Sequence, residues 1–412
     1  MKITERKLNE IKPYEKNAKE HKDGQVKKIA ASIKEFGFNQ PIVVDKDGVI
    51  IVGHGRLLAA QRLGLEKVPV LEVDVTEEQA KAYRLADNKL NESDWDMEIV
   101  IEELKSLSLE MLNLTGFDED LILETKEDKP DLGGIGVPKS VIGDVYQLGQ
   151  HRLVCGDSTD PETYKLLLEG GVKARLIFTD PPYGVDYIPR EGGTYDNAAR
   201  KIIGDDKTPE QTKEFFIKVL KVFQDFSTDD ANIYWWFANN LAEINHQAFR
   251  EAQWHLSQTV MWLKNSMIYS PGQNFHRMYE PCLVGWKMGK PRFVNRVFSN
   301  LTELWTLDQK KFADYLDVWY NKRDNTSKYI HPTQKPVQLA ERALKRSSEK
   351  GDIVLDAFGG SGSTLIACEQ LGRCARLIEL DPKYVDGIVG RWCKFTDDNS
   401  VIKNGKKIKW QL

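Results

Sequence analysis

Apolar residues in the second two thirds of the chain fall into short runs separated by amphipathic stretches. The length of these runs is typical of buried strands, and the stretches between them have helical spacing. Strands that alternate with helices predict an α/β fold with a doubly wound, mostly parallel sheet. The candidate strands are HRLVCGD (151–157), ARLIFTD (174–180), ANIYWWF (231–237), DIVLDAF (352–358) and RCARLIEL (373–380).

The first part of the chain has a different pattern. Val26, Ile29, Ile33 and Phe36 share one helical face, and Gly37 follows as a stop signal. Two apolar runs then flank the turn residues KDG, which predicts a hairpin, and VPVLEVDV reads as a further strand. We expect a small α+β domain over residues 1–95.

Residues 96–138 are expected to form an acidic linker. The stretch 90–131 holds 14 acidic and 3 basic side chains, a net charge of −11. KEDKPDLGGIGVPKS, at its end, has the Pro, Gly and charged residues of a linker. The rest of the chain has 55 basic and 48 acidic residues, so the overall charge of −4 does not exclude a nucleic-acid partner.

Composition indicates a cytoplasmic, globular protein. Apolar residues make up 41% and charged residues 29% of the 412 positions. No apolar run approaches the length of a membrane span, and the polar N-terminus does not resemble a signal peptide. The five cysteines form no C-x-x-C pair, so we expect reduced thiols and no metal site.

The motif TDPPYG, residues 179–184, follows the apolar run ARLIF. Pro181 and Pro182 lack backbone donors and must end the strand. Asp180 would then lie at the C-terminal end of the strand, either as a simple turn residue or as a functional acid. The motif alone does not decide between these two interpretations.

A glycine-rich turn, FGGSG (358–362), follows the run that ends at Asp356 and precedes a predicted helix. Glycine allows a cofactor to approach the backbone closely. The next predicted strand ends at Glu379, where an acid can bind the ribose hydroxyls of a nucleoside. The loop lacks both the G-x-G-x-x-G and the Gly-Lys-Ser/Thr patterns, so it favours neither a dinucleotide nor a triphosphate.

Together these stretches resemble the DNA amino-methyltransferases that use S-adenosylmethionine, over roughly residues 139–395, and we expect the methyltransferase domain to span residues 139–412. The order of the motifs, with DPPY before FGGSG, is similar to the circularly permuted beta class. The resemblance implies a Rossmann-like methyltransferase sheet, double-stranded DNA as substrate and S-adenosylmethionine as cofactor. It implies a catalytic motif of Asp180, Pro181, Pro182 and Tyr183. The implied cofactor-binding residues are Asp157, His331, Thr333, Lys335, Asp356, Phe358, Gly360, Ser361, Gly362 and Glu379.

The chemistry of methyl transfer accounts for the catalytic motif. An exocyclic amino group is a poor nucleophile because its lone pair is delocalised into the base. Acceptors from Asp180 and the rigid Pro181 carbonyl would expose that lone pair, and Tyr183 would stack on a flipped base. DPPY favours adenine N6 over cytosine N4, which stays an alternative. The region 265–330 is expected to recognise the target sequence.

The front domain resembles the ParB and sulfiredoxin-like domains through IVGHGRLLAAQRLG, residues 51–64. Gly53, His54, Gly55 and Arg56 would form a DNA- or nucleotide-binding helix start. The acid and paired arginines of CTP-hydrolysing relatives are missing, and His54 replaces the sulfiredoxin cysteine. The resemblance therefore implies binding but not catalysis in this domain.

Two classes of function remain open at this point. The first is a site-specific DNA adenine methyltransferase, of the kind found in restriction-modification systems, with an accessory ParB-like domain. The second is a ParB-like regulatory or partition protein whose methylase half is only a scaffold. The intact DPPY motif, glycine loop and Glu379 favour the first. The sequence also leaves a homodimer open as one assembly.

Overall fold

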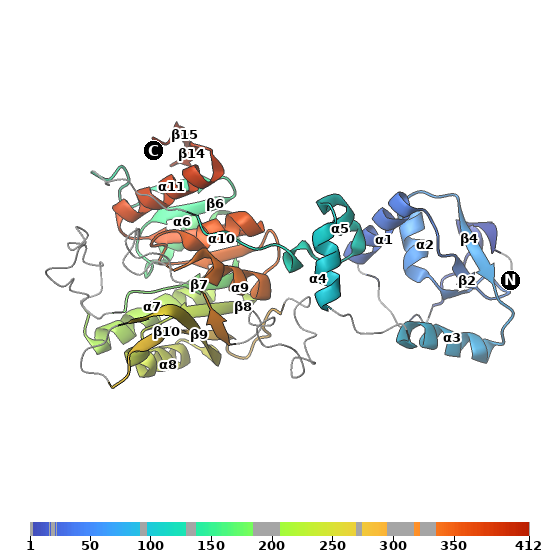
Figure 1. Cartoon of the computed structure of the whole chain (residues 1–412), viewed down its shortest axis with the longest axis horizontal. Coiled ribbons are helices and arrows are strands. Elements are labelled where there is room, and N and C mark those ends of the chain that lie inside the picture. Colours follow the sequence, from blue (N-terminus) through green and yellow to red (C-terminus); the bar gives the residue numbers. More distant parts are fainter. Residues whose placement is uncertain are drawn as a thin grey trace. The chain divides into compact units, whose positions relative to one another are not determined.

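The computed structural model divides the chain into two compact units, residues 1–123 and 124–412. Each unit is described here by itself (Figure 1). The structure describes residues 3–15, 17, 21, 23–90, 97–128, 137–183, 207–268, 274–294, 317–321 and 335–411, and all elements and contacts given below lie within these ranges.

The first unit contains a four-stranded sheet covered by helices, which confirms the expected α+β domain. The strand order is β1-β4-β2-β3, and only the β2–β4 pair is parallel. Its apolar core forms from Ile42, Ile50, Leu57 and Val70. The elements are β1 (Ile3–Lys7), η1 (Leu8–Glu10), α1 (Asp23–Phe36), β2 (Ile42–Val44), β3 (Ile50–Val52), α2 (His54–Arg62), β4 (Lys67–Glu72) and α3 (Glu77–Leu90).

The predicted helix and hairpin of this unit are both present. Helix α1 ends at Phe36, and Gly37 adopts a left-handed φ of 84° as the stop signal indicated. Val26 is buried on the inner face of α1, with Ile29 and Ile33 packed beside it. Phe36, the last residue of this helical face, is 53% exposed.

Residues 97–121 differ from the linker that their acidity suggested. They form α4 (Met97–Ser106), α5 (Leu109–Thr115) and η2 (Glu119–Leu121), which belong to the first unit. Val100, Leu104 and Leu112 are buried in a small cluster of their own, and Lys28 Nζ of α1 donates to the Gly116 carbonyl at 2.9 Å. Helical spacing of a few apolar residues outweighs a strongly acidic composition here.

The second unit is built on an eleven-stranded sheet, in the order β11-β9-β10-β8-β7-β12-β13-β6-β5-β14-β15. The five predicted strands are all present, and they form its parallel centre: β6 (His151–Cys155), β7 (Ala174–Thr179), β8 (Ser227–Trp236), β12 (Ile353–Asp356) and β13 (Cys374–Glu379). The remaining strands flank this centre at both ends (Figure 1), and they are β5 (Val145–Leu148), β9 (Trp254–Ile268), β10 (Arg277–Lys287), β11 (Val318–Tyr320), β14 (Ser400–Lys403) and β15 (Lys406–Lys409).

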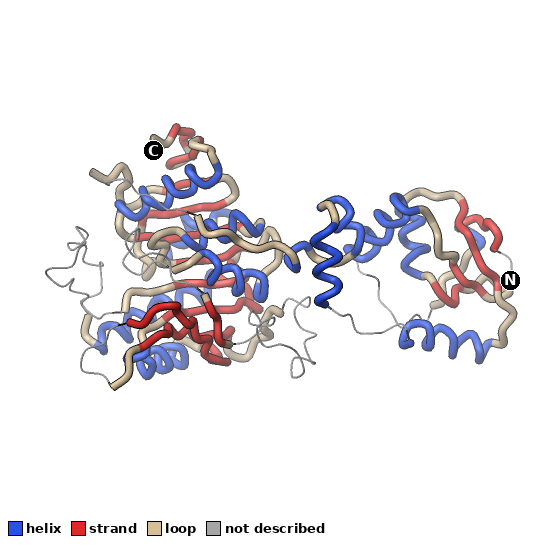
Figure 2. Tube along the Cα trace, viewed as in Figure 1, coloured by secondary structure: helices blue, strands red, loops and turns tan. Residues whose placement is uncertain are grey.

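Helices pack on this sheet on both faces, as expected for a doubly wound fold (Figure 2). On one face Ile177, Ile233 and Leu355 share an apolar cluster with helix residues such as Phe216 and Phe249. On the other, the Tyr234 hydroxyl meets Ser347 Oγ at 3.0 Å. The helical elements are α6 (Pro161–Leu167), η3 (Glu169–Gly171), α7 (Pro209–Phe226), η4 (Asn239–Leu241), α8 (Ala242–Glu251), α9 (Val337–Ser347), α10 (Ser363–Leu371) and α11 (Pro382–Thr396).

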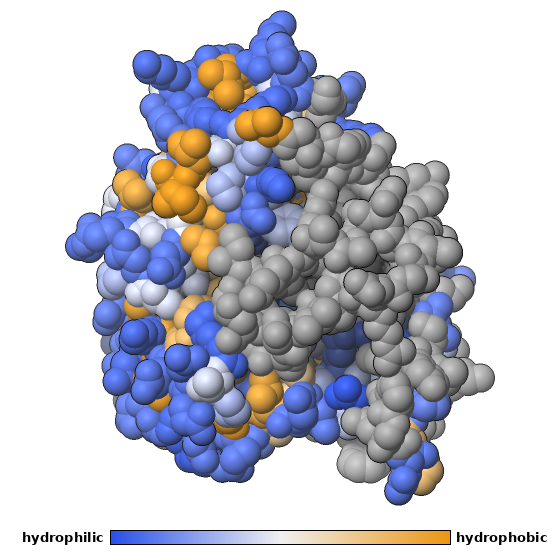
Figure 3. All heavy atoms as spheres, turned by 90° about the vertical axis from the view of Figure 1, so that its left-hand side faces the viewer, coloured by the Kyte–Doolittle hydropathy of each residue, from blue (hydrophilic) through white to orange (hydrophobic). Residues whose placement is uncertain are grey.

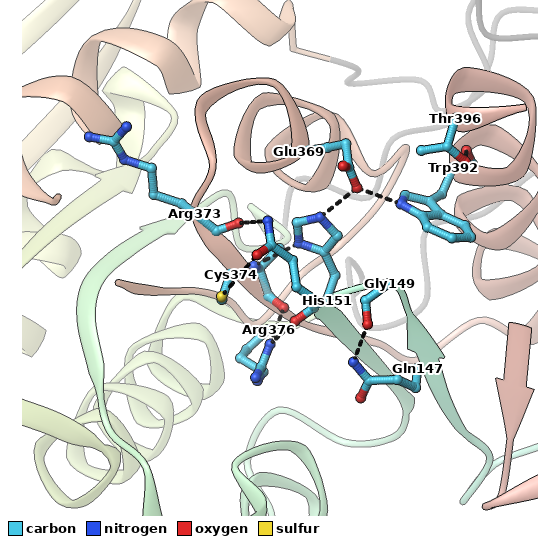
Figure 4. Close-up of polar contacts among 11 residues, drawn as sticks. Gln147, Gly149, His151, Glu369, Arg373, Cys374, Arg376, Trp392 and Thr396 are labelled. Carbon is cyan, nitrogen blue, oxygen red and sulfur yellow. Dashed lines mark hydrogen bonds and ion pairs between the residues drawn. The ribbon is translucent and has the colours of Figure 1, made fainter. Parts of the chain in front are cut away.

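A buried polar network holds β6 and β13 to the helices beside them (Figure 4). His151 Nδ1 accepts from the Ala375 backbone N–H at 2.9 Å, so a neutral ring carries its proton on Nε2. That Nε2 lies 2.9 Å from a carboxylate oxygen of Glu369 in α10, and the same oxygen accepts from Trp392 Nε1 in α11 at 2.8 Å. The network fixes α10 and α11 against the sheet.

The face of this unit that Figure 3 draws is mainly polar in its described part. In the face drawn in Figure 3, hydrophilic residues cover much of the described surface, and hydrophobic residues occur in small groups. Among the described helices, none is both long and apolar enough to cross a membrane.

Candidate active site

The site begins where β7 and β12 end side by side. Both strands are parallel neighbours, so their carboxyl ends meet at one edge of the sheet. Thr179 Oγ1, at the end of β7, donates to Asp356 Oδ1 at 2.8 Å, and Thr364 Oγ1 of α10 donates to Asp356 Oδ2 at 2.7 Å. Burial raises the pKa of Asp356 to about 7. This carboxyl joins two segments that are 177 positions apart in the sequence.

Asp180 follows β7 and holds two partners. Its Oδ1 accepts from the Tyr183 hydroxyl at 2.6 Å, and its Oδ2 accepts from Lys335 Nζ. Lys335 Nζ also lies 3.5 Å from Glu280 Oε2 of β10, whose other oxygen pairs with Lys264 of β9. Acidic and basic side chains therefore alternate along this network, in the order Asp180, Lys335, Glu280 and Lys264.

The protonation of this network follows from burial and charge. Burial raises the pKa of Asp180, while the adjacent Lys335 ammonium favours the ionised carboxylate. Burial alone would lower the pKa of Lys335, but attraction to Asp180 and Glu280 outweighs it and raises that pKa. Burial also raises the pKa of Tyr183 far above its ordinary value. Tyr183 thus stays a neutral donor and Lys335 stays a cation.

The glycine loop after β12 is shaped by its neighbours. Gly360 has a φ of 52° and Gly362 a φ of 80°, values that L side chains rarely adopt. The Gly360 N–H donates to Glu379 Oε2 at 2.7 Å, and the Asp381 N–H donates to Glu379 Oε1 at 2.9 Å. Burial raises the pKa of Glu379 to about 7 despite these two bonds. Glu379 therefore clamps the loop to the end of β13.

A single cavity of about 500 Å³ joins the DPPY motif to the glycine loop. Asp157 is exposed at its rim, where its Oδ1 accepts from the Thr159 N–H at 2.8 Å. The predicted residues that line this cavity are Asp157, Asp180, Pro181, Pro182, Tyr183, Lys335, Asp356, Phe358, Gly360, Ser361 and Glu379.

The remaining predicted cofactor residues are Gly362, His331 and Thr333. Gly362 is the N-cap of α10, which begins at Ser363, and it is not among the residues that line the cavity. His331 and Thr333 lie outside the described residues, as does most of the expected recognition region 265–330. Lys335, which we expected beside the cofactor, lines the cavity and also pairs with Asp180.

Sequence reasoning missed several residues of the site. Helix α7 supplies a wall that includes Phe215, whose ring centroid lies 6.0 Å from that of Phe358. Lys264 lies in β9 and Glu280 in β10, two antiparallel strands that contain no recognisable motif. Only the amphipathic pattern of α7 could have indicated one of these elements in advance.

The candidate site of the first unit is a helix start. Gly53 caps α2 with a φ of 111°, and Arg56 Nη1 donates to the Pro41 carbonyl at 2.9 Å. His54 Nε2 accepts from the Tyr14 N–H at 3.1 Å, and burial lowers the pKa of His54, which keeps this nitrogen an acceptor. The four residues are brought together as expected, but part of their hydrogen-bonding capacity is used within the unit.

The chain is similar to known proteins over both units. It is 44% identical over 80 residues to the ParB-like nuclease domain-containing protein YnaK of Escherichia coli strain K12, a match of 19% of this chain and 92% of that protein. It is 26% identical over 244 residues to the type II methyltransferase M.HpaI of Haemophilus parainfluenzae, covering 57% and 72% of the two chains. A crystal structure of an M1.HpyAVI–SAM complex aligns with a TM-score of 0.43 at 18% identity, over 58% of this chain and 97% of that one.

Two family models divide the chain between them. Residues 1–89 match the ParB N-terminal domain. Residues 174–390 match the DNA methylase family, and this stretch contains the DPPY motif, the glycine loop and Glu379. Because the second match covers more than half of the 412 residues, the chain belongs to the DNA methylase family of N6 and N4 amino-methyltransferases.

Proposed function

We propose that the chain transfers a methyl group from S-adenosylmethionine to the N6 amino group of adenine in double-stranded DNA. The observation that carries this proposal is the shared cavity, which has DPPY at one end and the Glu379-clamped glycine loop at the other. A methyl donor and a flipped base need adjoining sites that open into one another.

The cavity fits the cofactor that this family uses. Its volume of about 500 Å³ lies within the ordinary range for small-molecule sites. We assign the ribose hydroxyls to Glu379, whose carboxylate keeps acceptor capacity beyond its two backbone bonds. Asp157 at the rim would accept from the adenine amino group, and Phe358 offers an apolar wall. When bound, S-adenosylmethionine supplies an electrophilic methyl group on a sulfonium.

The DPPY residues would prepare the amino group for attack. Asp180 accepts one amino hydrogen and the Pro181 carbonyl accepts the other, which favours the nitrogen geometry that exposes the lone pair. Two prolines hold that carbonyl without reorganisation. The carboxylate of Asp180 need not be a strong base, because the nitrogen becomes cationic on methylation and loses its proton readily.

Lys335 and Tyr183 would tune this acid. The Lys335 ammonium favours the ionised form of Asp180, against the burial that raises its pKa. The Tyr183 hydroxyl donates to the same carboxylate. Its aromatic ring can stack on the flipped DNA base. Both bonds orient Asp180 before the substrate arrives, which is the preorganisation that an active site requires.

The DPPY form supports adenine, and cytosine N4 is the second candidate. Duplex DNA that holds both bases should be incubated with S-adenosylmethionine, digested and analysed by nucleoside mass spectrometry. We expect N6-methyladenine from the wild type and none from Asp180→Ala. N4-methylcytosine would overturn the choice of base, and no methylated base at all would favour a ParB-like regulatory protein with a methylase scaffold.

A further inference from the structure

Four consecutive residues at the start of the second unit run along three of its helices. We name residues 125–128 the strap. Thr125 contributes its backbone N–H and its hydroxyl, and both donate to Glu341 Oε2 of α9, at 2.8 and 2.5 Å. The backbone N–H and carbonyl of Lys126 bond to the side-chain amide of Gln370 in α10, at 2.8 and 3.0 Å. These bonds anchor the strap and fix the direction of the next two side chains.

Glu127 binds the start of helix α9. Its carboxylate oxygens accept from the backbone N–H groups of Val337 and Gln338, each at 3.0 Å. The first N–H groups of a helix have no partner within the helix, and a carboxylate there also meets the positive end of the helix dipole. Only Pro336 separates these groups from Lys335, the partner of Asp180. Glu127 therefore fixes the backbone that carries Lys335.

Asp128 binds α11 and, through it, the glycine loop. Its two oxygens accept from Nε and Nη2 of Arg391, at 2.7 and 2.5 Å, in a bidentate pair. The remaining arm of the guanidinium, Nη1, donates to the Ser361 carbonyl at 2.8 Å. The side chain of Arg391 is only 2% exposed and that of Asp128 is 12% exposed, so water competes little for this pair. Ser361 lines the cavity.

We propose that Glu127 and Asp128 are positioning residues for methyl transfer. Glu127 acts through the α9 start on Lys335 and hence on Asp180, whereas Asp128 acts through Arg391 on the cofactor loop. The inference rests on the proposed function, because it assigns the two ends of the cavity to base and cofactor. It predicts that the two neighbouring acids affect different steps of one reaction.

The test uses the full chain with Glu127→Ala, Asp128→Ala and the control Lys126→Ala. The Lys126 side chain is exposed, and the strap bonds described above use only its backbone. We expect Asp128→Ala to raise the Kd for S-adenosylhomocysteine and the KM for S-adenosylmethionine about 10-fold, since it removes a charge-assisted bond, with kcat at saturating cofactor within 2-fold of wild type. Glu127→Ala should lower kcat about 10-fold and leave that Kd unchanged. Lys126→Ala should match the wild type in this Kd, in the KM for S-adenosylmethionine and in kcat.

Conservative variants separate positioning from simple stabilisation. Asp128→Asn keeps one acceptor for Arg391 and Glu127→Gln keeps one for α9, so each should recover part of the lost Kd or kcat. The strap would be merely structural if the alanine variants melted at lower temperature but kept wild-type kcat, KM and Kd while folded. Binding of S-adenosylhomocysteine, read by calorimetry, tests the Asp128 branch even if no base were methylated. Absence of methylation by the wild type would reject the proposed function, whereas an unchanged Kd in Asp128→Ala would reject this inference.

Discussion

The two units contain turns of the same local design. In the first, β3 leads through Gly53 into α2, and in the second, β12 leads through a glycine loop that ends at Gly362 into α10. Both glycines occupy the N-cap with a left-handed φ, of 111° and 80° respectively. A helix N-terminus of this kind presents free N–H groups to an anion or a cofactor. The two turns share this N-cap, although one residue separates β3 from α2 and six residues separate β12 from α10.

Their surroundings differ. At the first turn, Arg56 donates to the Pro41 carbonyl and His54 accepts from the Tyr14 N–H, so these side chains help to hold the unit together. At the second, Gly360 is clamped by Glu379 and faces a cavity that also reaches Asp180. A strand–glycine–helix turn therefore supplies a backbone shape, while the neighbouring strands supply the chemistry.

The largest effect on methylation should come from substitution of Asp180, which lines the same cavity as the second turn. Asp180→Ala removes the acceptor for the amino group, and loss of one preorganised electrostatic contact of this kind typically slows an enzyme at least about 100-fold. Methylation measured with labelled S-adenosylmethionine should fall by that factor or more, with calorimetric affinity for S-adenosylhomocysteine near wild type. Tyr183→Phe keeps an aromatic face but loses the hydroxyl bond to Asp180, so it should retain only part of the activity. A wild-type rate in Asp180→Ala would contradict the mechanism.

The two turns can be compared directly by matched substitutions. Gly360→Asp and Gly53→Asp each place a carboxylate at a residue with positive φ, so both should lower the melting temperature. Only Gly360→Asp adds a second acid beside Glu379, and it should weaken S-adenosylhomocysteine binding at least about 100-fold, or roughly 2.8 kcal/mol. Equal binding losses in both variants, measured by calorimetry, would mean that the comparison is mistaken.

The raised pKa of Glu379 predicts a pH-dependent cofactor affinity. Its pKa is about 7, and the ionised carboxylate is the stronger acceptor for a ribose hydroxyl. Affinity for S-adenosylhomocysteine should therefore rise up to about 10-fold between pH 6 and pH 8, and Glu379→Gln should flatten the profile. A wild-type profile that is flat, or that falls with pH, would argue against this role.

Ionisation of Glu379 should strengthen cofactor binding but lower the free energy of unfolding. A buried acid whose pKa is raised from 4.5 to about 7 binds more protons in the native state than in the unfolded state. Its contribution to the free energy of unfolding is fully present below pH 4.5 and is lost as the pH rises through about 7. Urea titrations without cofactor should show that Glu379→Gln loses less stability than the wild type over this interval.

The smallest effect should come from the first turn. If Arg56 contacts a phosphate, Arg56→Ala should weaken DNA binding by about 10-fold or less and reduce the slope of log affinity against log salt by about 1. The methylated sequence should not change, because phosphate contacts position a protein without reading bases. A variant that methylates a different sequence would show that the first unit reads bases.

The parallel centre of the second unit was predictable because its signals are local. Each of the five strands is an apolar run followed by a polar or glycine-rich turn, and the motif residues sit at the ends of these runs. Parallel strands that end at one edge gather those residues without further information. Asp180, Gly360 and Glu379 therefore line one cavity as their positions suggested.

The remaining parts depend on contacts that no local signal records. Glu280 reaches Lys335 only because β10 pairs with β8, an antiparallel contact set by the whole sheet. The acidic composition of residues 90–131 predicted a linker and gave no indication of helices α4 and α5 or of the strap. A carboxylate that caps a distant helix, as Glu127 does, looks in sequence like any exposed acid. Its role becomes visible only with its partners in place.

The most direct test of the central claim is single-molecule, methylation-aware sequencing of DNA from cells that express the full chain. We predict N6-methyladenine at one defined sequence motif across the genome, and its absence from cells that express Asp180→Ala at the same level. The same modification in both cultures, or none in either, would contradict the claim that this cavity methylates adenine in DNA.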